Sequence, residues 1–190
     1  MRIEITPYNP HWPEQFSNER ERIAAALGPF ALSIDHIGST AIPGLAAKPV
    51  VDMQVGVSSL QDFDTSEAAS SLERLGYVHR TDLQASAPFR RFFARRNHLL
   101  APDAHIHLVA NDHPWRQRHL LFRDYLRAND GARDRYQALK LALAERDWVD
   151  INGYTDAKTE LILQLEEEAF AFFALTDEHR DLVRLGRIGG

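Results

Sequence analysis

Between residues 36 and 55 the chain places small, hydroxylated, basic and acidic residues close together, in a loop between two apolar runs. Gly38 allows the backbone to turn with positive φ or to approach a ligand closely, and Ser39 and Thr40 add hydroxyl groups beside backbone N–H groups. Lys48, late in the loop, either reaches back over the same site as a point charge or is a solvated loop lysine. A Gly-Ser pair alone also occurs in ordinary turns. Together these four residues are candidates for binding phosphate.

Asp52 lies inside the β-branched run at 50–57, which predicts a buried strand. An unpaired carboxylate there would be costly to desolvate, so Asp52 must pair, bind a metal or become neutral. Two residues along, on the same strand face, stands Gln54. A glutamine offers a carbonyl oxygen but no charge, so a second cation would be attracted much less strongly.

Three histidines are candidate partners for Asp52. His105 and His107 alternate with apolar residues in a predicted strand and therefore face the same side of it, and His36 lies in another predicted strand. With Asp52 they could form a site for zinc or another transition metal. They could instead be hydrogen-bonded histidines in a polar patch, and His107 could serve as a general base near neutral pH. Asp52 and His107 are therefore the candidate catalytic residues.

The stretch from His36 through Gly38, Ser39 and Lys48 to Asp52 resembles the signature of the GrpB family. These are small bacterial proteins whose proposed relatives are the nucleotidyltransferases of the DNA polymerase beta superfamily. The resemblance continues in the segments Tyr8 to Pro13, His105 to Val109, Arg118 to Arg127 and Tyr154 to Lys158. It implies a Gly-Ser turn that holds a nucleotide triphosphate and an acidic strand that holds Mg²⁺ or Mn²⁺ during nucleotidyl transfer.

A basic stripe on the predicted helix at 113–128 is usually a solvated face, but the resemblance implies that Arg118, His119 and Arg123 face the site, where guanidinium groups suit phosphate oxygens. Tyr154 and Lys158, four residues apart on a predicted helix, either hold a base and a phosphate or cap a helical bundle. The chain departs from the superfamily at Gln54 and in lacking a third carboxylate on the later strand. That departure puts a two-metal mechanism in doubt.

Three functions follow as alternatives. The first is a nucleotidyltransferase-like enzyme that binds a nucleoside triphosphate and a divalent metal and transfers the nucleotidyl group to an unknown acceptor. The second is a non-catalytic protein that binds a nucleotide or phosphometabolite with a degenerate metal site. The third is a hydrolase with a single histidine-bound metal. A Walker-type phosphate loop is excluded because Gly44 is followed by Leu45 rather than by lysine.

The composition favours a cytoplasmic protein with a small-molecule ligand. The formal net charge of -5 and a pI near 6.0 argue against a long nucleic acid as partner. The chain has no cysteine, so disulfides and thiolate metal sites are excluded. No signal peptide is expected, because residues 1–6 alternate charged with β-branched residues, and no membrane span is expected, because no apolar run approaches about 20 residues.

A strand-rich first half followed by helices predicts an α+β sandwich, a mixed sheet of nucleotidyltransferase-like topology with helices packed against it. The periodicity predicts strands at 2–6, 32–37, 50–57, 77–80, 89–95 and 104–109, and helices at 13–27, 60–75, 113–128, 132–146 and 155–174. We expect a single domain over residues 1–176 and a loose tail over 177–190.

Overall fold

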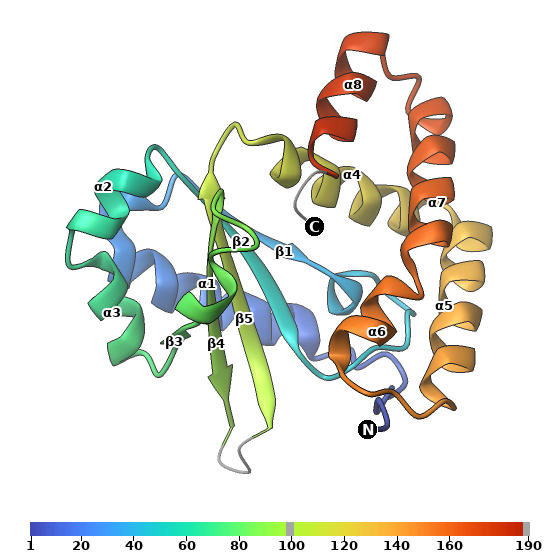
Figure 1. Ribbon diagram of the computed structural model, residues 1–190, viewed down its shortest axis with the longest axis horizontal. Coiled ribbons are helices and arrows are strands. Elements are labelled where there is room, and N and C mark those ends of the chain that lie inside the picture. Colours follow the sequence, from blue (N-terminus) through green and yellow to red (C-terminus); the bar gives the residue numbers. More distant parts are fainter. Residues whose placement is uncertain (98–100, 188–190) are drawn as a thin grey trace.

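The computed structural model describes residues 1–97 and 101–187 and has the expected α+β architecture around one mixed sheet (Figure 1). The strands are β1 (Ser33–Ile37), β2 (Val51–Val57), β3 (Val78–His79), β4 (Arg90–Arg96) and β5 (Pro102–Ala110), in the order β1-β2-β5-β4-β3. β2 and β5 are parallel, and the other neighbours are antiparallel. The predicted mixed sheet is confirmed.

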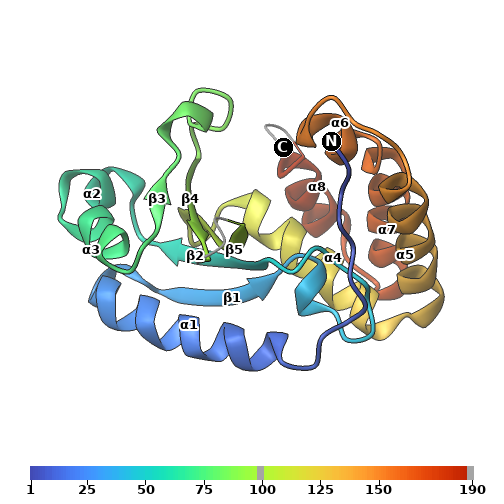
Figure 2. The same ribbon diagram turned by 90° about the horizontal axis from the view of Figure 1, so that it is seen from below.

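One face of the sheet is apolar and is covered by three helices. α1 (Trp12–Leu27) runs along β1 and β2 (Figure 2), and α2 (Leu60–Thr65) and α3 (Ala68–Arg74) complete the layer. Alternate residues of the central strands, among them Met53, Val55 and Ile106, are fully buried there against Ile23 and Leu72. Period-two alternation of apolar residues produces this face.

The remaining helices form a bundle beside the sheet (Figure 1). They are α4 (Pro114–Ala128), α5 (Asp130–Ala144), α6 (Ile151–Asp156), α7 (Thr159–Phe172) and α8 (Asp177–Leu185). The loop after β1 contributes Ile42 and Leu45 to the bundle core, where they meet Leu126 and Leu165. The loop that the sequence marks as a phosphate site is therefore anchored in the bundle.

Four sequence predictions are wrong in detail. Residues 2–6 form no strand but only a bridge between Thr6 and Ala47. The helix at 60–75 is two helices, because Ser66 takes an extended conformation and its hydroxyl accepts from the N–H of Ala68, the first residue of the second helix. The helix at 155–174 is interrupted at Lys158. Residues 177–185 are helical rather than loose, while 188–190 lie outside the described residues.

Register decides which polar side chains share the other face of the sheet. Asp52 is opposite His105, and Gln54 is opposite His107, so these four side chains point to the same side. His36 is paired with Met53 and therefore points to the α1 face. No helix within the described ranges is long and apolar enough to cross a membrane.

Candidate functional site

Asp52 is at the centre of a chain of polar contacts on the open face of the sheet. His105 Nδ1–H donates to Asp52 Oδ1 over 2.9 Å, and His107 Nε2 lies 4.0 Å from the same oxygen. Arg90 Nη1–H donates to His107 Nδ1 over 3.2 Å. Burial would raise the pKa of Asp52, but the hydrogen bonds and charges of the two histidines hold it well below its ordinary value. Asp52 is therefore an ionised carboxylate.

Gly38 brings the loop backbone against this carboxylate. Its φ is +70°, which side chains rarely adopt, and a Cβ there would lie 2.6 Å from Asp52 Oδ2. The short 3₁₀ turn Ser39–Ala41 follows at once. Ser39 lies beside the hydroxyl of Tyr136, and Tyr136 in turn is close enough to feel the charge of Asp52. The Gly-Ser turn therefore lies directly against the acidic strand.

The chain contains 22 lysines and arginines, of which only three are lysines. All three lie close enough to Asp52 to be affected by its charge. Burial lowers the pKa of Lys48, of Lys140 to about 7 and of Lys158 to about 8. Each lysine is attracted by Asp52, and Lys48 depresses the pKa values of the other two. The charge of one carboxylate thus acts on three ammonium groups, and Lys48 opposes the charge of the other two.

Two of these lysines stand on tyrosine rings. Lys140 Nζ is 5.4 Å from the ring centre of Tyr136, and Lys158 Nζ is 4.2 Å from that of Tyr154. The sequence prediction included Tyr154 and Lys158 but did not include Tyr136 or Lys140 among the site residues. The same Tyr-x3-Lys spacing, and the scarcity of lysine, could have identified them.

Tyr154 does not offer an open ring for a base. It is 2% exposed and packs edge-on against Trp148, at 6.0 Å between ring centres. Its contribution to the site is to support Lys158, which is the N-cap residue of α7.

Helices α4 and α5 hold the loop between β1 and β2 through side chains. Arg123 donates to the carbonyl of His36, and Arg127 to that of Ala41. On α5, Gln137 accepts from Ala46 N–H over 2.7 Å, and Lys140 donates to the carbonyl of Ala46 over 2.6 Å. Because both polar groups of one loop residue are held, the position of the following Lys48 is fixed by α5.

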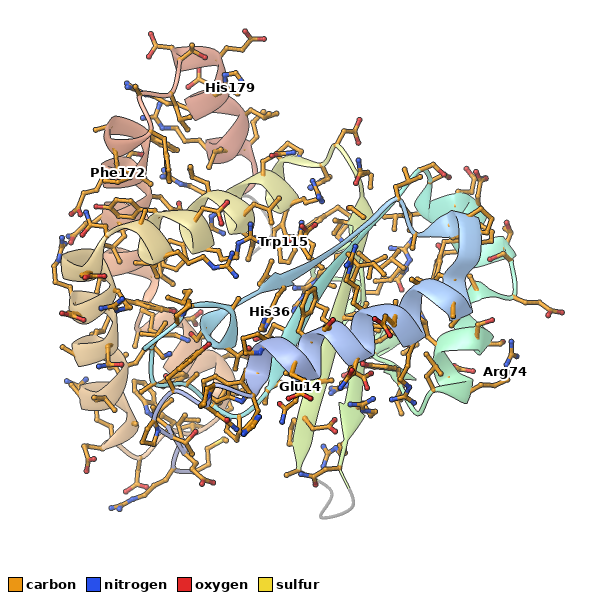
Figure 3. The ribbon with its side chains drawn as sticks, turned by 180° about the vertical axis from the view of Figure 1, so that it is seen from behind. Glu14, His36, Arg74, Trp115, Phe172 and His179 are labelled. Carbon is orange, nitrogen blue, oxygen red and sulfur yellow. The ribbon has the colours of Figure 1, made fainter. Side chains whose placement is uncertain are left out.

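His36 and Thr40 lie away from the site. His36 is stacked on Phe16 of α1, at 4.7 Å between ring centres, on the side of the sheet that α1 covers (Figure 3). Its Nε2–H donates to the hydroxyl of Thr40, which donates to the carbonyl of Val50. The predicted convergence of His36 with Asp52 is wrong. His36 shares a face with its partner Met53, and Met53 and Asp52, which are adjacent on β2, point to opposite faces. The Thr40 hydroxyl is already used inside the protein.

The two predicted site arginines have other partners. Arg118 pairs with Glu166 of α7 over 2.6 Å, and that glutamate is only 1% exposed. Arg123 pairs with Asp124 over 2.7 Å and lines a cavity of about 290 Å³ at the edge of β1. Neither is brought to the lysine cluster, because helix spacing shows which residues share a face but not what that face meets.

Gln54 is on the same face as Asp52, as predicted, but it is fully buried. Neither its amide nitrogen nor its carbonyl oxygen has a hydrogen-bond partner within the described residues. Its carbonyl cannot reach an exposed ion beside Asp52 without a shift of the side chain.

The donor set fits a metal poorly. Within residues 1–97 and 101–187 no group of three or more histidine, aspartate or glutamate side chains is arranged to hold an ion. The relevant atoms are also used otherwise: Asp52 Oδ1 accepts from His105, and His107 Nδ1 accepts from Arg90. The expected four-ligand set of Asp52, His36, His105 and His107 is not formed.

Comparison with known proteins gives consistent matches over most of the chain. The family profile described as GrpB protein matches residues 2–168. UPF0157 protein YqkA of Bacillus subtilis (strain 168) is 37% identical over 168 residues, which are 88% of this chain and 47% of that protein. The chain thus spans about half the length of that relative.

Two further proteins are similar to this chain over most of its length. A dephospho-CoA kinase of Mycolicibacterium paratuberculosis is 33% identical over 177 residues, covering 82% of this chain and 43% of that protein. The crystal structure of the conserved protein GrpB from Enterococcus faecalis has a TM-score of 0.78 and 32% identity, and the match covers 90% of this chain and 100% of that one.

Proposed function

The chain belongs to the GrpB family, and from that premise we propose that it binds the phosphate groups of a nucleotide or a similar phosphorylated small molecule beside Asp52. The observation that supports this most strongly is the convergence of the only three lysines of the chain, Lys48, Lys140 and Lys158, on one carboxylate. A bound polyanion would remove their mutual repulsion and supply the charge that burial demands.

The lysines also come from three separate segments: the loop before β2, helix α5 and the N-cap of α7. Such an arrangement surrounds a compact anion better than a stripe along one helix. Gly38 adds a close approach of the loop backbone to Asp52. One relative is named dephospho-CoA kinase, which supports including dephospho-CoA among the ligands tested.

In this proposal the phosphate site beside Asp52 works without a pair of metal ions bound by the protein. Asp52 stays ionised because the imidazoles of His105 and His107 support it, and we assign it the task of keeping the lysines charged and in place. The sequence-based expectation of Mg²⁺ or Mn²⁺ is tested by titrating nucleotides with and without Mg²⁺. The metal can then arrive with the nucleotide, because a nucleotide can carry its own Mg²⁺.

The test is calorimetric titration of ATP, AMP and dephospho-CoA, each with EDTA and with Mg²⁺. We expect binding in EDTA, and we expect Lys158→Met to weaken it about tenfold, as for loss of a charge-assisted hydrogen bond. Arg74→Gln is the matched control, because Arg74 is exposed on α3 and far from the bundle (Figure 3). A strict requirement for Mg²⁺, or equal weakening by both variants, would contradict the proposal.

Covalent labelling gives a second, ligand-independent readout. Pyridoxal 5′-phosphate combines an anion with an aldehyde that reacts with unprotonated lysine, and lysines of lowered pKa react at neutral pH. After borohydride reduction we expect peptide mapping to find the label on Lys140 or Lys158, with protection by excess ATP. Labelling that ATP does not slow would count against a shared phosphate site.

Nucleotidyl transfer is a second candidate, favoured by the hydrogen bond between His105 and Asp52. That bond places the proton on Nδ1 and leaves Nε2 of His105 as an acceptor for the proton of an attacking hydroxyl. The new O–P bond would form at the α-phosphorus while pyrophosphate leaves. Release of pyrophosphate from labelled nucleoside triphosphates with a metabolite pool, lost in His105→Gln, is the expected result; binding without any release excludes this candidate.

A further inference from the structure

Arg90 differs from its neighbours on β4 in having no acidic partner. Arg91 pairs with Asp64, and Arg95 with Glu19 and Asp103. No carboxylate of the described ranges lies within salt-bridge distance of Arg90, whose side chain donates instead to His107. Burial without an anion lowers the pKa of this guanidinium. A partly buried cation without a counter-charge is costly unless something supplies one.

The surroundings of Arg90 are aromatic. Its guanidinium carbon lies 5.5 Å from the ring centre of Phe92 and 5.6 Å from that of Trp115. His107 is also against these rings, 4.9 Å from Phe92 and 5.3 Å from Trp115. These rings hold the guanidinium in place without neutralising it.

The other donors of Arg90 are open. A guanidinium has five N–H groups, and one of them is used by His107. None of the Arg90 nitrogens is among the buried unpaired atoms of the described residues. The remaining donors therefore face solvent, on the same side of the sheet as Asp52 and with only the His107 imidazole between.

We propose that Arg90 anchors a second oxyanion subsite, so that the ligand held by its phosphate at the three lysines carries a second phosphate or a carboxylate that reaches Arg90. This inference rests on the proposed function and narrows the ligand to molecules with two separate anionic groups. The planar guanidinium suits either oxyanion because both accept two parallel hydrogen bonds.

The test compares three nucleotides by calorimetry: AMP, adenosine 3′,5′-bisphosphate, which adds a phosphate, and adenylosuccinate, which adds carboxylates. We expect one of the two larger ligands to bind about tenfold more tightly than AMP, the gain typical of a charge-assisted pair. Arg90→Gln should abolish that gain and leave AMP binding within about twofold. Which ligand gains identifies phosphate or carboxylate as the second group.

Two variants serve as controls. Arg90→Lys keeps the charge but loses the planar pair of parallel donors, so it should keep part of the gain in affinity over AMP. Arg74→Gln should keep all of that gain. Thermal melts establish that each variant is folded. The proposal is overturned if neither larger ligand exceeds AMP, or if Arg90→Gln weakens all three ligands equally. If ATP, AMP and dephospho-CoA all fail to bind, the proposed function itself fails; if one of them binds but neither larger ligand exceeds AMP, only this inference fails.

Discussion

At the scale of the residue, Gly38 is where the loop touches the acidic strand. Its positive φ would strain any side chain, and its missing Cβ leaves room for Asp52 Oδ2. We expect Gly38→Ala to lower the free energy of unfolding by about 1–3 kcal/mol and to weaken nucleotide binding, because the carboxylate must rotate away from its histidines. Urea denaturation and calorimetry measure the two effects.

Gly44 in the same loop offers a matched control. Its φ is +79°, but a Cβ there would meet nothing closer than 3.8 Å, at the end of the Arg133 side chain. Gly44→Ala should therefore cost similar stability without weakening binding. Equal loss of binding in both variants would mean that loop strain, and not contact with Asp52, explains the effect of Gly38→Ala.

Gln54 makes a second prediction at this scale. Its amide is buried without a partner, so Gln54→Leu should raise the free energy of unfolding by about 1–2 kcal/mol. Gln54→Glu should lower it, because a carboxylate at this depth must stay protonated or be desolvated. Urea denaturation of the two variants decides; a Leu variant as unstable as the Glu variant would show that the amide has a partner.

Among single residues, sequence reasoning was most informative where period-two geometry applied. It placed Asp52, Gln54, His105 and His107 on faces of strands, and these four do share one face. The burial of Gln54 was not visible, because burial depends on what packs above the strand. His36 was misplaced because pairing register, which cannot be read from one strand alone, decides which side of the sheet it faces.

At the scale of elements, the strands of the core and the main helices were predictable because β-branched runs and helical periodicity are local. The breaks at Ser66 and Lys158 were not. Ser66 leaves the helical conformation, whereas Ala157 and Lys158 keep helical backbone angles and form only a tight turn between α6 and α7. α8 was missed because its segment is rich in charge. Its Arg184 and the following Arg187 pair with Glu167 of α7, and only Val183 is buried.

The clamp on the signature loop belongs to the same scale. Arg127, Gln137 and Lys140 reach the backbone of Ala41 and Ala46 from more than 80 residues away in sequence. No spacing rule identifies such pairs. The bundle thus shapes the loop, which explains why a helical half that carries no carboxylate of the site is still needed to form it.

At the scale of the whole molecule, the site joins the sheet and the bundle, and its lysines connect folding to pH. The folded-state pKa values of Lys140, about 7, and Lys158, about 8, lie below the ordinary 10.5. At a pH between the folded-state and the ordinary pKa values, the unfolded chain binds more protons than the folded chain. The contribution of these lysines to the free energy of unfolding therefore rises as pH increases from about 7 to about 10.

The buried histidines His36 and His119 make the stability of the fold depend on pH below about 6.5. Burial lowers the pKa of His36 to about 4 and of His119 to about 3, from 6.5. The unfolded chain again binds more protons, so stability falls as pH drops from 6.5 towards 4 and 3. At about 1.4 kcal/mol for each unit of pKa shift, each of the two histidines contributes a loss of about 3–5 kcal/mol.

The last prediction concerns the effect of a ligand on this pH dependence. A phosphate bound at the lysines should raise their pKa values towards 10, because it stabilises the charged form. Binding near pH 8 must then take up protons, and affinity must fall as pH rises from 7 to 9. Calorimetry of ATP binding in two buffers of different ionisation enthalpy measures the proton uptake directly. Lys158→Met should reduce that uptake, whereas Arg74→Gln should leave it unchanged, and binding without proton uptake at pH 8 would show that the ligand does not contact the lysines.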